Sequence, residues 1–195
     1  MKTTRSCMRV CVTVAAAMLG CGGDSTGGPQ SATPDEATAC TLVSPASGWW
    51  NQTFPEQSGV FHAELDATPS ATNIDAVVGL SNGTASSYGQ LAAIVRFNPD
   101  GLIDARDGGE YRADHYISYV AGTIYHFRLD IDIAAHRYSV YLRVPGSSYY
   151  DPIAANLAFR TEQASVARLT TVASKIDSSD GAVQEIGRAS CRERV

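Results

Sequence analysis

Charged and aromatic side chains alternate with large apolar ones in two neighbouring runs, residues 124–133 and 137–144. Alternate residues of a β-strand point to opposite faces, so the polar members of each run share one surface. A loop of two or four residues within 134–137 would pair Ile133 with Tyr138 and join the runs as a hairpin. The polar surface of this hairpin would carry the candidate ligand-binding residues His126, Arg128, Asp130, Tyr141 and Arg143.

This register would place Arg128 directly opposite Arg143 and Asp130 opposite Tyr141. Two facing arginines repel each other, at a cost of up to about 1 kcal/mol, unless an anion lies between them. A sugar carboxylate could fill that position through charge-assisted hydrogen bonds, with Tyr141 as a stacking surface and His126 nearby. In the structural alternative, carboxylates within the sheet neutralise both arginines; the candidates are Asp130, Glu64 and Asp66.

The same hairpin offers two aspartates on one strand, Asp130 and Asp132. In glucanases, carboxylates at i, i+2 and i+4 or i+5 of a strand supply a nucleophile and a general acid. Here Ala134 and Ala135 follow, so the third carboxylate is absent. A site like that of alginate lyases would need a histidine, a tyrosine and a glutamine or arginine in one groove, and the hairpin offers His126, Tyr141 and Arg128. Because the strand motifs of such lyases are absent, the hairpin predicts binding without catalysis, with a lyase or hydrolase as the alternative.

Other residues suited to binding lie outside the hairpin. Trp49 and Trp50 point in opposite directions in a strand, so one is expected in the core and the other exposed for stacking on a sugar; Trp50 is the candidate. An acidic run beside several glycines could hold calcium, although its spacing matches no EF-hand loop. It consists of Asp100, Asp104, Asp107, Glu110 and Asp114. The four histidines lack the spacing of a zinc site, and no other cofactor is predicted.

The N-terminal residues differ in composition from the rest of the 195-residue chain. Residues 1–20 carry basic residues and then a short apolar run, which predicts a signal peptide. The run ends as Met18-Leu-Gly-Cys21, which resembles a bacterial lipobox. We therefore predict that Cys21 is lipidated and anchors the protein to the cell envelope, at the outer membrane or the cell surface. Residues 21–39 lack large apolar side chains and predict a flexible linker.

Residues 185–195 resemble the translation of a sequencing adapter, and their three arginines contrast with the preceding segment. This predicts an artefactual tail after a domain, residues 40–184, that is truncated at its C-terminus. Residues 22–184 hold nine basic and eighteen acidic residues, a net charge of −9, compared with −5 for the whole chain. Such acidity argues against a nucleic-acid partner, which needs clustered lysine and arginine.

A periodicity of two recurs across residues 40–184 and predicts an all-β domain. Apolar residues alternate with other residues over 61–67, 91–97, 127–133, 138–144 and 153–159. Turn sequences rich in glycine, asparagine, aspartate and proline separate these runs. Strands at this spacing with half-polar faces indicate an antiparallel two-sheet β-sandwich. Residues 161–169 could form a short helix or an irregular link.

Four runs of this domain resemble the concanavalin A-like lectin/glucanase family: DAVVGLSNG at 75–83, VRFNPDGLID at 95–104, YHFRLD at 125–130 and YSVY at 138–141. The resemblance covers about Gly59 to Ile176 and implies a jelly-roll sandwich in which sugars lie across one sheet. The family includes lectins, lyases, glycosidases and spacers. With the polar hairpin, it predicts a non-catalytic, lectin-like module that binds a polysaccharide or cell-surface glycan. The alternatives are an enzyme that uses the same face and a ligand-free spacer or adhesion module.

Overall fold

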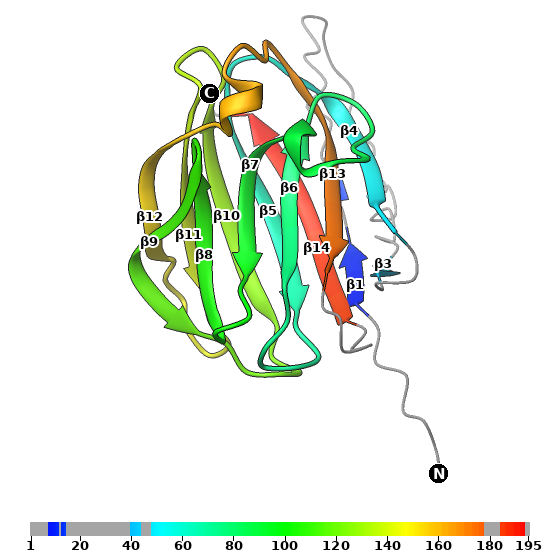
Figure 1. The fold of residues 1–195 in the computed structure, drawn as a ribbon, viewed down its shortest axis with the longest axis vertical. Helices are drawn as coiled ribbons and strands as arrows, with labels where there is room; N and C mark the ends of the chain where they lie inside the picture. Colours follow the sequence, from blue (N-terminus) through cyan, green and yellow to red (C-terminus); the bar gives the residue numbers. More distant parts are fainter. Residues whose placement is uncertain (1–7, 12, 15–39, 44–47, 178–183, 194–195) are drawn as a thin grey trace, which may run out of the picture.

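The computed structural model describes residues 8–11, 13–14, 40–43, 48–177 and 184–193, in which strands form two stacked sheets (Figure 1). Sheet A has eight strands, and its main path runs in the order β1-β3-β14-β5-β10-β11-β12. All its pairings are antiparallel except that of β2 with β14. Its strands are β1 Met8–Cys11, β2 Thr13–Val14, β3 Cys40–Val43, β5 Val60–Thr68, β10 Tyr125–Asp132, β11 Arg137–Arg143, β12 Asp151–Ala158 and β14 Gln184–Glu193.

Sheet B has six strands, in the order β4-β13-β6-β7-β8-β9, and all its pairings are antiparallel. Short 3-10 helices precede β7 and follow β12, at Tyr88–Gln90 (η2) and Thr161–Gln163 (η3). The strands of this sheet are β4 Trp50–Gln57, β6 Ala76–Ser81, β7 Leu91–Phe97, β8 Leu102–Asp107, β9 Glu110–Ser118 and β13 Leu169–Ile176. The predicted all-β, antiparallel two-sheet sandwich is thus confirmed, and η3 falls within the expected short helix or link.

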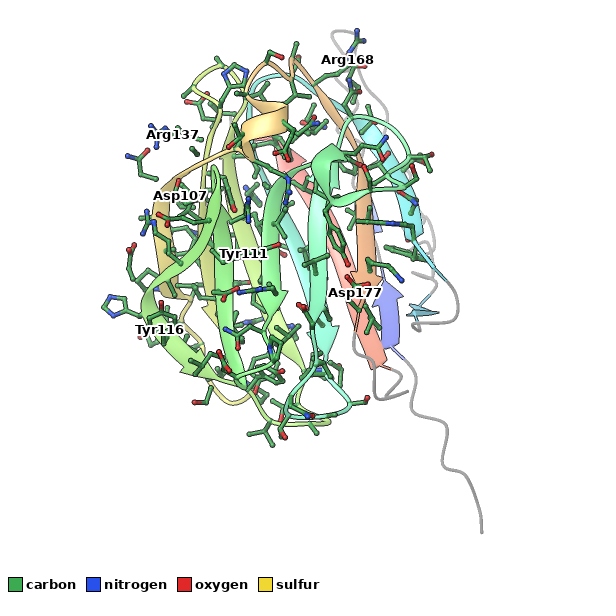
Figure 2. The ribbon with its side chains drawn as sticks, in the orientation of Figure 1. Asp107, Tyr111, Tyr116, Arg137, Arg168 and Asp177 are labelled. Atoms are coloured by element: carbon green, nitrogen blue, oxygen red, sulfur yellow. The ribbon has the colours of Figure 1, made fainter. Side chains whose placement is uncertain are left out.

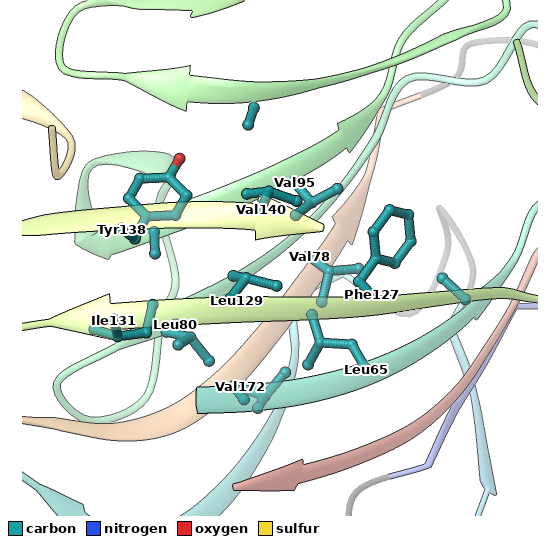
Figure 3. Close-up of a cluster of buried hydrophobic side chains, with 14 of the residues drawn as sticks. Leu65, Val78, Leu80, Val95, Phe127, Leu129, Ile131, Tyr138, Val140 and Val172 are labelled. Carbon is teal, nitrogen blue, oxygen red and sulfur yellow. The ribbon is translucent and has the colours of Figure 1, made fainter. Parts of the chain in front are cut away.

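The main core fills the space between the sheets (Figure 3). In β5 and β10 every second side chain is buried, as the alternation predicts. Phe97 lies at the centre of an aromatic cluster, with ring centroids 5.0 Å from Tyr119 and 5.8 Å from Tyr125 and Phe127. Such edge-to-face pairs stabilise the core beyond the burial of their surface.

Two strands depart from simple alternation. All residues of β6 are buried, because a smaller apolar cluster covers the outer side of sheet B at this strand. This outer cluster contains Val77, Ala85, Leu91, Ile94 and Ala173. In β12 the expected inward position of Ala155 is wrong: Ala154 is buried and Ala155 is exposed. Asn156 has a φ of 54°, and the pairing with β11 shifts beside it, so an irregularity resets the alternation.

The predicted signal peptide, linker and tail remain predictions. Cys21 and the whole predicted linker, residues 21–39, lie outside the described residues, while β1 and β2 fall within 1–20 and β14 includes 185–193. Over the ranges that the structure describes, no helix has the length and apolar character needed to cross a membrane.

Candidate functional site

The hairpin of β10 and β11 presents the polar face that the sequence predicts, but in a different register. Arg128 pairs with Tyr141, and His126 pairs with Arg143, so the expected opposition of the two arginines is wrong by two residues. The turn occupies 133–136 rather than 134–137, because Asp132 accepts a hydrogen bond from the Ala135 amide at 2.9 Å. His136 supplies the left-handed residue of this turn, with φ at 52°.

Carboxylates within sheet A engage two of the predicted ligand-binding residues. The Arg128 guanidinium lies against Asp130, with Nε 3.1 Å from Oδ1, and His126 Nδ1 lies 2.5 Å from Asp66 Oδ1. These pairs match the alternative in which carboxylates of the sheet neutralise the charged side chains of the hairpin. Arg128 therefore needs no ligand to balance its charge. Arg143 differs, since it forms no ion pair with any residue that the structure describes.

The two tryptophans point in opposite directions as expected, but Trp50 is the inward one. Trp50 packs against the main core, which corrects its placement as an exposed stacking residue. Trp49 instead packs against the outer cluster of sheet B, where its ring centroid lies 5.0 Å from that of Tyr88. Of the two tryptophans, Trp49 is therefore the one that lies on an outer face.

A pocket of about 240 Å³ opens on the outer face of sheet B. Its lining combines cationic, aromatic and acidic side chains, and Figure 2 labels Tyr111 and Asp177 on this face. We call it the arginine pocket; it is lined by Asp75, Val77, Tyr88, Arg96, Arg106, Tyr111, Arg160 and Asp177. Sequence reasoning missed this site, because its residues come from β6, β7, β8, β9 and η2 and from positions next to β6, η3 and β13.

Neighbouring strands bring the arginines of the pocket together. Register places Arg96 of β7 opposite Asp104 of β8, and Arg106 of β8 opposite Tyr111 of β9. Asp104, which is only 4% exposed, accepts two hydrogen bonds from Arg96, at 2.9 and 2.7 Å. Asn98 donates a third to Asp104 at 2.9 Å. This bidentate pair fixes the plane of the Arg96 guanidinium.

The Tyr111 ring is the aromatic surface of the pocket. Arg96 Cζ lies 3.7 Å from its centroid and Arg106 Cζ lies 5.0 Å from it, both within the range of a cation–π interaction. Burial raises the pKa of the Tyr111 hydroxyl, with Arg96, Arg106 and Arg160 acting in the opposite direction. Tyr111 therefore remains a neutral phenol at physiological pH.

Arg106 is the arginine of this pocket without a carboxylate partner among the described residues. Its Nε donates to the Gly108 carbonyl at 3.0 Å, whereas Arg160 Nε lies 3.1 Å from Glu162 Oε2. Across the core, the Tyr138 hydroxyl of sheet A donates to the Arg106 carbonyl and so holds the backbone that positions this side chain. Arg106 therefore has guanidinium nitrogens available for an anion.

The loop before β7 carries Tyr88 into the pocket. The Asn51 side chain holds this loop through two hydrogen bonds with the Ala85 backbone, at 2.9 and 2.7 Å. The Tyr88 hydroxyl donates to Asp177, and burial together with that bond raises the pKa of Tyr88 well above its usual range. Burial also raises the pKa of the Asp75 carboxyl, and the charge of Asp177 acts in the same direction.

The acidic run considered for calcium makes mainly arginine contacts. Asp104 binds Arg96, and Arg112 contacts both Asp107 and Asp114. Among the described residues, no group of three or more histidine, cysteine, aspartate or glutamate side chains is arranged to hold a metal ion. Arg96 on β7 and Asp104 and Arg106 on β8 would point to the arginine pocket only if the pairing of these two strands were already known.

Comparisons with known proteins agree with this architecture. A sialidase structure matches at a TM-score of 0.51 and 15% identity, over 74% of this chain and 14% of that one. The chain has the fold of an antiparallel two-sheet β-sandwich. A GH131 β-glucanase catalytic domain from Podospora anserina matches at a TM-score of 0.49 and 12% identity, over 76% of this chain and 66% of that one.

At the level of sequence, no family profile matches the chain. A gellan lyase from a Bacillus species is 30% identical over 98 residues, which are 49% of this chain and 4% of that protein. The chain thus spans a small part of the gellan lyase.

Proposed function

We propose that this chain is a non-catalytic carbohydrate-binding module whose arginine pocket holds an anionic group of an acidic polysaccharide. One observation carries the proposal: Arg106 faces a 240 Å³ pocket against the Tyr111 ring, with no carboxylate partner among the described residues. A planar guanidinium can bind a sugar carboxylate through two parallel hydrogen bonds, which gives both affinity and orientation.

The remaining lining suits the rest of a sugar residue. Tyr111 and Tyr88 offer aromatic surfaces against which the apolar face of a pyranose can pack. Asp75 and Asp177 can accept hydrogen bonds from sugar hydroxyls, because carboxylate oxygens accept strongly. Gellan is an anionic polysaccharide, and the partial match to a gellan lyase supports an acidic polymer as the first ligand to examine.

The location of the protein is part of this proposal. Lipidation at Cys21 and a linker over 21–39 would place the module outside a membrane, where extracellular or surface glycans are accessible. In this arrangement the lipid is the only contact with the membrane, and nucleic acid is not a partner, in keeping with the acidic composition.

Affinity electrophoresis tests the proposal. The folded module should be retarded in gels that contain polygalacturonate or gellan, and should migrate unchanged in gels that contain hydroxyethylcellulose. Added salt should reduce the retardation, because screening weakens charge-assisted contacts at an open site. Equal retardation by neutral and acidic polymers, or none by either, would refute it.

A second candidate function, glycoside hydrolysis, is favoured by the presence of two carboxylates in the arginine pocket, Asp75 and Asp177. The raised pKa of Asp75 would suit a general acid, and Asp177, which accepts a hydrogen bond from Tyr88, would be the second carboxylate. We rank this function second because binding requires only the arrangement of Arg106 and Tyr111, whereas hydrolysis also requires Asp75 and Asp177 to act as a catalytic pair.

A reducing-end assay on acidic polymers separates the two functions. The binding proposal predicts no new reducing ends and no unsaturated product with the wild-type protein. Hydrolysis predicts reducing ends that disappear in Asp75→Asn while polymer binding is retained.

A further inference from the structure

A second cationic and aromatic surface lies on the opposite outer face of the sandwich. Arg128 and Arg143 come from β10 and β11, and Tyr150 comes from the connection between β11 and β12. The Tyr150 centroid lies 5.3 Å from Arg128 Cζ and 5.4 Å from Arg143 Cζ, and the Tyr141 centroid lies 4.6 Å from Arg128 Cζ. We call these four residues the sheet A patch.

Arg128 has an ion-pair partner in this patch, whereas Arg143 has none among the residues that the structure describes. Arg128 is paired with Asp130, with Nε 3.1 Å from Oδ1. Arg143 forms no ion pair with a described residue, and its Nε is buried without a hydrogen-bond partner. A buried donor without an acceptor is unfavourable, so an anion that accepts from this guanidinium would supply a missing interaction.

The sheet A patch and the arginine pocket cannot be occupied by one short ligand. Stacked sheets lie about 10 Å apart, and Arg143 and Arg106 project from the outer faces of different sheets. The buried neighbours Leu142 and Ala105 point into the core between them. An oligosaccharide held by Arg106 would therefore leave Arg143 open to a second chain.

We infer that the sheet A patch is a second binding site for acidic saccharides, and that the module bridges two polysaccharide chains. Arg143 would bind the sugar carboxylate, and Tyr150 would pack against the sugar ring. The bridging role rests on the proposed function of the arginine pocket, whereas the second site rests on Arg143 and Tyr150 alone. Binding at two faces converts a module with moderate affinity into a cross-linker of polymer chains.

Titration calorimetry with tetragalacturonate, and light scattering with polygalacturonate, test the inference. The wild-type module should bind two tetrasaccharides and should raise the scattering of the polymer. Arg143→Gln and Tyr150→Ala should each reduce the stoichiometry to one and abolish the rise in scattering. Arg168→Ala is the matched control: this exposed arginine pairs with Glu56 and lies well apart from Tyr111 in Figure 2, so both readouts should stay at wild-type values.

The outcomes separate this inference from the proposed function. A wild-type stoichiometry of one that Arg143→Gln leaves unchanged would overturn the second site. If Arg106→Ala then abolished binding, the proposed function would stand alone. If Arg106→Ala changed nothing while Arg143→Gln abolished all binding, the arginine pocket and the bridging role would be rejected and the sheet A patch retained. Thermal melting of each variant shows whether a loss reflects unfolding.

Discussion

Replacing Arg106 with alanine is expected to weaken binding of tetragalacturonate at the arginine pocket roughly 10- to 100-fold. Hydrogen bonds to charged groups contribute about 1.5–3 kcal/mol each, and Arg106 would supply the main one to the sugar carboxylate. The side chain also makes a cation–π contact with the Tyr111 ring, so its removal takes away one of the contacts that hold this ring in place. Titration calorimetry measures the change, with Arg143→Gln as background so that one site is observed.

A lysine at position 106 separates the effect of the positive charge from that of the planar guanidinium. Arg106→Lys keeps the positive charge but loses the planar pair of donors, so we expect an affinity between those of the wild type and Arg106→Ala. The matched control is again Arg168→Ala, which removes one exposed positive charge outside both sites. An affinity unchanged in Arg106→Ala, or lowered equally in Arg168→Ala, would show that Arg106 does not contact the ligand.

Replacing Asp104 with alanine is expected to lower the free energy of unfolding by about 3–5 kcal/mol, as when one partner of a buried ion pair is removed. Asp104 is nearly fully buried and accepts hydrogen bonds from Arg96 and Asn98. Its loss would leave the Arg96 guanidinium without its acceptor and would release the turn that Asn98 organises at 98–102. Denaturant unfolding followed by tryptophan fluorescence measures the change.

The exposed pair of Arg168 and Glu56 provides the comparison for this prediction. Both side chains are more than half exposed and lie 3.1 Å apart, so Glu56→Ala should change the free energy of unfolding by less than about 1 kcal/mol. A loss in Asp104→Ala no larger than that in Glu56→Ala would contradict the structural role of the buried pair. Weaker saccharide binding is also expected in Asp104→Ala, because Arg96 would lose its fixed position over Tyr111.

Much of the fold could be predicted from the alternation of apolar residues. Strands β5, β10 and β11 each bury one face along their whole length, so a period of two gives both the strand and its inward side. The hairpin register could not be fixed in this way, because a shift of two residues keeps every side chain on the same face. The register depends instead on a local feature of the turn, the hydrogen bond that the Ala135 amide donates to the Asp132 carboxylate.

The arginine pocket was beyond such reasoning for a different reason. Periodicity fails in β6 and β7, where side chains on both faces are buried, because the 82–90 loop covers the outer side of sheet B. The partners of Arg96 and Arg106 lie on adjacent strands, and only the pairing of β7, β8 and β9 brings them together. The regular alternation therefore directed the sequence-based search for a site to sheet A, whereas the arginine pocket lies on sheet B.

A crystal structure of the module with tetragalacturonate tests the central proposal most directly. We expect a galacturonate carboxylate within hydrogen-bonding distance of the Arg106 guanidinium and a pyranose ring packed on Tyr111 or Tyr88. A saccharide bound only at another surface, with the pocket of sheet B unoccupied at saturating ligand, would contradict it.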